Sequence, residues 1–252
     1  MHRRFVLALL TAIPLAVAAT AAGAADIKVL AAAAVKEPFE QLVAVFDRES
    51  GNKVDATFGP VGGLVNKIKA GEKPDVIILS AAGMDGLDKQ GSLVTATRAE
   101  LGRAVASVAV KAGAPAPDIS TPDAFKQALI AARKVAYTDP AAGGTAGIYF
   151  TKLLQTFGIA DQVKAKAVLG SSGAAVADAV AKGDADLGVT FGSELLPNKG
   201  VKIVGPLPQS IGLTVAYVAA VASWSKEGDA ARALIGYLTK PASRDHFKGA
   251  GL

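Results

Sequence analysis

The feature that most constrains the fold is a sequence pattern that occurs twice. Residues 58–80 read FGPVGGLVNKIKAGEKPDVIILS, and residues 169–191 read LGSSGAAVADAVAKGDADLGVTF. Each segment has an apolar residue, a Gly-x-x-Gly turn, a helical stretch, a glycine, an aspartate and an apolar run. The turn recurs after 111 residues. Both segments therefore predict a strand, a tight turn, a helix and a second strand.

Such a turn joins the carboxyl end of a strand to the amino end of a helix, which is where open α/β sheets bind ligands. An alternative explanation is that strand–helix–strand units resemble one another in any α/β protein. The repetition favours two similar lobes, with a cleft between them that receives helix N-termini from both sides.

The rest of the chain continues the alternation of strands and helices. Apolar runs at 27–31, 53–58 and 76–80 predict strands, and residues 35–48 have the apolar spacing of a helix. The run at 76–80 is apolar throughout, as expected for a parallel strand that is covered on both faces. We therefore predict an α/β protein whose sheets are mostly parallel.

The first 25 residues have the features of a cleavable signal peptide. Arg3 and Arg4 form a basic start, residues 5–19 are apolar, and Ala-Gly-Ala at 22–24 is a small-residue cleavage site. The apolar core is shorter than the roughly 20 residues of a membrane span, which makes a membrane anchor the weaker alternative. The chain has no cysteine, so disulfides and a lipid-modified cysteine are excluded. We expect export to the periplasm, with full secretion as the alternative.

The sequence offers little catalytic chemistry. After cleavage, His246 is the one remaining histidine, and we expect it to be a packing or surface residue. No hydrolase, metalloprotease or nucleotide-binding motif is complete, so we expect neither an enzyme nor a cofactor. Asp184 and Asp186 are interpreted as loop residues, with a metal site as the alternative. The net charge of +5 falls to +3 without Arg3 and Arg4, which is too mild to indicate nucleic-acid binding.

Four small, neutral turns precede predicted helices, at 31–35, 59–63, 141–147 and 170–174. The start of a helix offers N–H donors without partners and roughly half a positive charge. Four such starts that converge would bind an anion without any fixed cation. Ordinary helix capping is the alternative for each turn taken alone. The small residues favour binding, because they let a ligand reach the backbone.

These residues resemble the periplasmic molybdate-binding proteins of ABC importers. The resemblance is carried by VLAAAAV at 29–35, by 57–80, by TAGIYFTKLLQTFGIAD at 145–161 and by 188–208. It implies a two-lobed type II periplasmic binding protein fold, in which 26–105 and 214–252 form lobe one and 106–213 form lobe two. It also implies a monomer that captures a small anion, an oxyanion of the molybdate or tungstate type, and delivers it to an ABC permease at the inner membrane.

The resemblance also implies a binding site. Contact positions of the family match Ala34, the turn at 60–62, Ala146, Gly173 and Phe191. The family has hydroxyl side chains at three of these places, and here Ala34, the turn and Phe191 lack them. Either nearby hydroxyls, at Ser80, Thr145, Ser171, Ser172 or Thr190, replace them in a rearranged oxyanion site, or the pocket accepts another anion. The predicted ligand-binding residues are Ala33, Ala34, Val61, Gly62, Ser80, Thr145, Ala146, Ser172, Gly173, Thr190 and Phe191.

The missing hydroxyls leave the ligand open. Each charge-assisted hydrogen bond contributes roughly 1.5–3 kcal/mol, so their loss weakens a site for a molybdate or tungstate oxyanion. A small organic carboxylate needs fewer donors and tolerates more apolar wall. Two other classes stay open as weaker alternatives: a periplasmic enzyme on the same fold and the sensing domain of a regulator.

Overall fold

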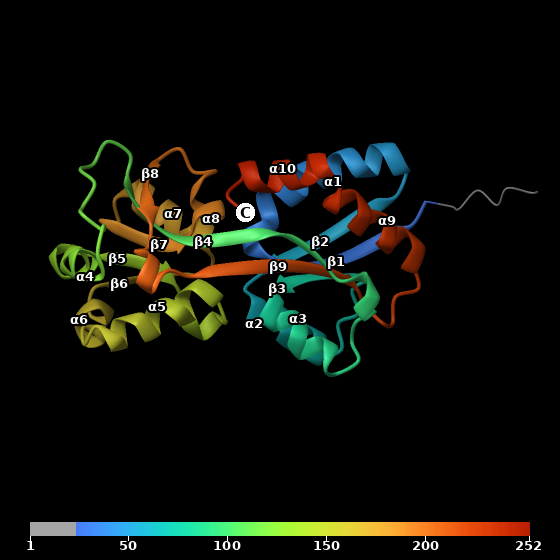
Figure 1. The fold of residues 1–252 in the computed structure, drawn as a ribbon, viewed down its shortest axis with the longest axis horizontal. Coiled ribbons are helices and arrows are strands. Elements are labelled where there is room, and N and C mark those ends of the chain that lie inside the picture. Colours follow the sequence, from blue (N-terminus) through green and yellow to red (C-terminus); the bar gives the residue numbers. More distant parts are fainter. Residues whose placement is uncertain (1–23) are drawn as a thin grey trace, which may run out of the picture.

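The computed structural model describes residues 24–252, so the predicted signal peptide lies outside the described residues except for its last two positions. The chain has the predicted α/β fold, with one nine-stranded sheet in the order β2-β1-β3-β9-β4-β7-β5-β6 and β8 paired with β4. Helices cover both faces of the sheet (Figure 1). Within residues 24–252, no helix is both long and apolar enough to cross a membrane.

We use the name lobe one for the part of the fold that holds the first three strands. It consists of β1 (Asp26–Ala32), η1 (Ala33–Val35), α1 (Lys36–Ser50), β2 (Lys53–Gly59), α2 (Val61–Lys69), β3 (Val76–Ser80), α3 (Ala81–Asp88), η2 (Thr95–Thr97), α9 (Gly228–Thr239) and α10 (Pro241–Gly249).

We use the name lobe two for the part of the fold that lies between β4 and β9 in the sequence. It consists of α4 (Pro122–Ala131), β5 (Val135–Thr138), η3 (Pro140–Ala142), α5 (Thr145–Thr156), α6 (Ala160–Lys164), β6 (Ala167–Gly170), α7 (Gly173–Lys182), β7 (Leu187–Phe191), α8 (Gly192–Leu195), β8 (Val201–Pro206) and η4 (Gln209–Ile211).

Two long strands connect the lobes. β4 (Ala99–Lys111) and β9 (Thr214–Val221) run side by side across the middle of the molecule (Figure 1). β4 pairs with β9 as far as Val105, and from Ala106 onward it pairs with β7 and β8. The exact division into lobes, at 105–106 and 213–214, stays a prediction.

The two copies of the repeated pattern fold as predicted. The first forms β2, α2 and β3, and the second forms β6, α7 and β7. The recurring aspartates form hydrogen bonds to the backbone of neighbouring segments. The Asp75 carboxylate accepts a hydrogen bond from the Lys28 amide in β1, and the Asp186 carboxylate accepts one from the Arg133 amide just before β5. β1 pairs in parallel with β2 and β3, as does β5 with β6 and β7.

The linking strands differ from the expected parallel arrangement. β9 pairs antiparallel with β3 and β4, and β4 pairs antiparallel with β7 and β8. The sheet is therefore mixed, because the chain enters and leaves lobe two along neighbouring strands that run in opposite directions.

The core of lobe one lies on both faces of its sheet. Side chains of α1 and α9, such as Phe39 and Leu234, pack on one face, and those of α2 and α3, such as Leu64 and Met84, pack on the other. Alternate residues of β3 point into the two layers, which explains why this strand is apolar throughout.

Candidate functional site

The predicted turns meet at a pocket between the two lobes. The pocket has a volume of about 30 Å³ and adjoins a groove of about 680 Å³. The pocket and the groove share lining residues such as Pro60 and Glu194, so together they suit a small solute. Lobe one contributes the end of β1, η1 and the start of α2, while lobe two contributes the starts of α5, α7 and α8. The lining residues are Ala32, Ala33, Ala34, Gly59, Pro60, Val61, Thr138, Gly144, Thr145, Ala146, Ser172, Phe191, Glu194 and Tyr217.

The start of α5 is the clearest donor at this pocket. No side chain caps it, and the amides of Thr145 and Ala146 have no acceptor among residues 24–252. Side-chain caps are present at α3, α4 and α7, for example Thr121 at α4, and several other helices also start without one. What distinguishes α5 is that its uncapped start lines the pocket. The α5 start also lies close to β5, since a Cβ added at Gly147 would meet the Thr138 carbonyl oxygen at 1.9 Å. The glycine-rich turn therefore places uncapped amides at the pocket.

The lobe-one side offers similar helix starts without side-chain caps. η1 begins after Ala32 and α2 begins after Pro60, and no described side chain caps either one. The Gly62 amide is not available to a ligand here, because it donates to the Gly143 carbonyl of lobe two at 3.1 Å. Gly62 therefore joins the lobes, where the sequence predicted a ligand contact.

Glu194 is a site residue that the sequence analysis missed. Its carboxylate accepts hydrogen bonds from the Gly173 amide at 3.0 Å and from the Thr190 hydroxyl at 2.8 Å. Burial raises the pKa of this carboxyl above its usual value, while the hydrogen bonds from Thr190, Gly173 and the Phe191 amide oppose the shift. Two groups predicted to hold the ligand, Gly173 and Thr190, thus hold Glu194 instead.

Tyr217 is the second missed residue. Its ring packs edge-on against Phe191, with the centroids 6.1 Å apart, and the residue lines the pocket. Burial raises the pKa of its hydroxyl, and the charge of Glu194 adds to that effect. Phe191 lacks the hydroxyl of the resembling family, whereas Tyr217 of β9, which does carry a hydroxyl, lines the same pocket.

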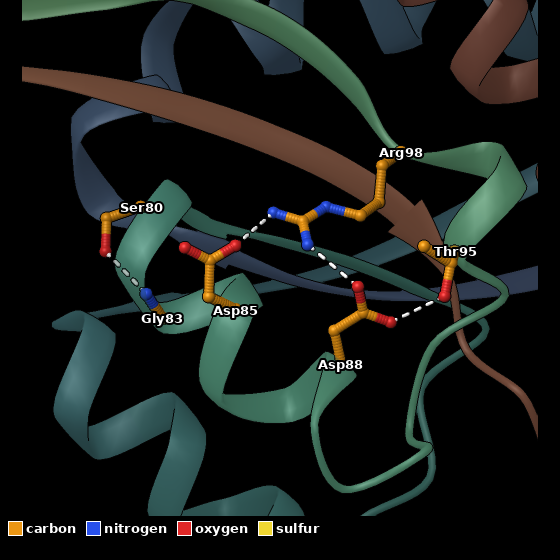
Figure 2. A network of polar contacts seen from close by, with 6 residues as sticks. All are labelled: Ser80, Gly83, Asp85, Asp88, Thr95 and Arg98. Carbon is orange, nitrogen blue, oxygen red and sulfur yellow. Dashed lines mark hydrogen bonds and ion pairs between the residues drawn. The ribbon is translucent and has the colours of Figure 1, made fainter.

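The other predicted residues divide into two groups. The structure brings seven of them together at the pocket: Ala33, Ala34, Val61, Thr145, Ala146, Ser172 and Phe191. Ser172 also caps α7, since its hydroxyl accepts from the Ala175 amide. Ser80 does not line the pocket, and Figure 2 shows its hydroxyl accepting from the Gly83 amide at the start of α3. Ser171 lines the outer groove.

Other titratable groups lie elsewhere. His246 belongs to α10, and its Nε2 is buried without a hydrogen-bond partner among the described residues. Asp186 pairs with Arg133, which lowers the pKa of its carboxyl. Within residues 24–252, no cluster of three or more His, Cys, Asp or Glu residues is arranged to hold a metal ion.

Comparisons with known proteins agree with this architecture. A family model described as bacterial extracellular solute-binding protein matches residues 27–252. An aconitate isomerase from Pseudomonas sp is 32% identical over 232 residues, which cover 89% of this chain and 86% of the relative. Molybdate-binding protein ModA from Azotobacter vinelandii is 29% identical, with 92% of each chain covered.

Solved structures share the fold. The periplasmic molybdate-binding protein of Azotobacter vinelandii superposes with a TM-score of 0.73 at 22% identity, over 89% of this chain and 97% of that one. This match agrees with the type II periplasmic binding protein fold that the resemblance implies. The family model spans nearly all of the described residues. The chain therefore belongs to the bacterial extracellular solute-binding protein family.

Proposed function

We propose that this protein is the periplasmic binding component of an ABC importer that captures a small organic carboxylate between its lobes and delivers it to a membrane permease. The carrying observation is the pocket itself, where the uncapped starts of α2, α5 and η1 meet across the two lobes. Unpaired amides at helix starts bind anions, and closure of two lobes around a solute is a known mode of capture. We propose that the chain works as a monomer.

The balance of donors and acceptors favours a carboxylate over molybdate or tungstate. A tetrahedral oxyanion presents four acceptor oxygens, whereas a carboxylate group presents two and is attached to an apolar carbon chain. The pocket offers amides at α5, the Thr145 side chain and the Tyr217 hydroxyl, beside an apolar wall that includes Val61 and Phe191. Each missing charge-assisted hydrogen bond costs roughly 1.5–3 kcal/mol of binding, so a ligand with fewer oxygens fits this donor set better.

Thermal unfolding with a panel of anions tests the proposal. The panel contains molybdate, tungstate, sulfate, phosphate and small mono- and dicarboxylates. At one hundred times its Kd, a ligand of the native state adds about 2.7 kcal/mol of stability, which raises Tm by about 5–10 °C in a chain of this size. We expect a carboxylate to produce this shift. Stabilisation by molybdate or tungstate alone indicates an oxyanion ligand instead of a carboxylate. An unchanged Tm with every anion contradicts the anion-binding site.

A matched pair of variants assigns the binding to this pocket. Thr145→Ala removes a side-chain hydroxyl at the start of α5, whereas Thr156→Ala removes one at the far end of the same helix. We expect the first variant to weaken binding and the second to leave it unchanged. Equal affinities in the two variants contradict a role for the α5 start.

A second candidate function is isomerisation of a bound polycarboxylate. Glu194 and Tyr217 line the same pocket, and a relative that is 32% identical is an aconitate isomerase. A buried carboxyl with a raised pKa suits a proton carrier in general acid–base catalysis. Proton NMR of a single aconitate isomer incubated with the protein tests this. Conversion to another isomer by the wild type, and the absence of that conversion in Glu194→Gln, supports an enzymatic function. An unchanged spectrum contradicts it and leaves transport as the proposed function.

A further inference from the structure

The carboxylate of Glu194 occupies an anion-binding site that is formed by the start of α7 and by Thr190. The first amide of α7, at Gly173, donates to one carboxylate oxygen, and the Thr190 hydroxyl donates to the other. The fit is close, because a Cβ added at Gly173 would lie 2.1 Å from Oε2 of Glu194. The missing side chain at Gly173 thus makes room for the carboxylate of Glu194.

The same carboxylate faces the solute, since Glu194 lines both the pocket and the adjoining groove. The pocket lining contains no lysine or arginine among the described residues. In the groove, Lys36 is paired with Glu40, and the other charged side chains, Glu37 and Asp178, are acidic. A ligand that carries only acceptor atoms therefore meets the negative charge of Glu194, and the lysine of the groove, Lys36, is already paired with Glu40.

We infer that Glu194 selects the solute: it rejects anions that present only acceptor oxygens and accepts a small carboxylate that also carries a hydroxyl group. This inference rests on the proposed function, because it assumes that a carboxylate binds at the uncapped start of α5. The ligand carboxylate takes the amides of Thr145 and Ala146, and the ligand hydroxyl donates to Glu194. Glu194 is thus a specificity-determining residue.

Paired ligands that differ by one hydroxyl test this inference. The full mature chain is titrated by calorimetry with lactate against propanoate, malate against succinate, and molybdate. A hydrogen bond to a charged acceptor favours the hydroxylated member of each pair by about 10-fold or more. We expect that preference in the wild type, together with no detectable binding of molybdate.

Two variants complete the experiment. Glu194→Gln keeps the shape but removes the charge, and Glu37→Gln does the same for an acid of the outer groove that does not line the pocket. We expect the hydroxyl preference to fall below about threefold and molybdate binding to appear in Glu194→Gln. Glu37→Gln should behave like the wild type. Unfolding curves confirm that both variants are folded.

The outcomes separate this inference from the proposed function. Equal affinities within each pair, a preference that survives in Glu194→Gln, or molybdate binding to the wild type overturns the role of Glu194. In the first two cases the carboxylate site itself still stands. If neither carboxylates nor molybdate bind to the wild type, the proposed function fails and the inference fails with it.

Discussion

The backbone contact between Gly62 and Gly143 makes a sharp prediction about lobe closure. The Gly62 amide donates to the Gly143 carbonyl across the lobes, and a Cβ added at Gly62 would lie 3.0 Å from the Gly143 Cα. Gly62→Ala therefore pushes the two turns apart and weakens their hydrogen bond in the closed form. A neutral hydrogen bond contributes about 0.5–1.5 kcal/mol, so the affinity for a solute that requires closure should fall by about 3–10-fold.

Gly63→Ala is the matched control. It lies in the same turn of α2, but its added Cβ would approach neighbouring atoms no closer than 3.8 Å. Both changes replace a helical glycine with alanine, so their effects on the open protein are comparable. Calorimetric titration with the best carboxylate of the panel should show Gly62→Ala weakened and Gly63→Ala within about twofold of the wild type. Equal affinities for the two variants refute a role for this contact in closure.

Three further predictions concern stability. Burial raises the pKa of Glu194 in the folded protein, so the contribution of Glu194 to stability falls as pH rises above the usual pKa of glutamate. The Tm of Glu194→Gln minus the Tm of the wild type should therefore increase between pH 4 and pH 8, and a difference that stays constant contradicts this. Gly147→Ala should unfold at a Tm lower by several degrees, because its Cβ meets the Thr138 carbonyl oxygen, and an unchanged Tm refutes that contact. The Thr95 hydroxyl and Arg98 lower the pKa of Asp88 (Figure 2). Arg98→Ala should therefore lower the Tm at pH 7, and should lower it by less as pH falls below the usual aspartate pKa of 3.8. A loss of Tm that does not depend on pH contradicts this.

The fold could be predicted well because its signals are local. The repeated pattern fixes a strand, a turn and a helix within a short stretch, and these became β2–α2–β3 and β6–α7–β7. Strand direction in the linking region could not be predicted, because no strand was predicted over β4 or β9 from their residues. Their antiparallel pairing depends on the path of the whole chain between the lobes.

The site was predicted in part. The backbone of the α5 start could be found because glycine and small residues before a helix are a local signal. Glu194 and Tyr217 could not, because their roles depend on neighbours far away in the sequence or on a pocket that forms only in the fold. Phe191 of β7 has no hydroxyl, whereas Tyr217 of β9 lines the same pocket and has one, and no pattern within β7 indicates this. Gly62 was assigned to the ligand, although its amide serves the other lobe.

The central claim is that a small carboxylate binds at the uncapped start of α5. The most direct measurement is the amide proton shift of Thr145 and Ala146 in the ¹⁵N-labelled protein during titration with the carboxylate that gives the largest thermal shift. Both amides lack acceptors among the described residues, so a bound carboxylate should move both resonances downfield and saturate them with the calorimetric Kd. If the carboxylate binds while these two resonances stay fixed, the account of the site is wrong.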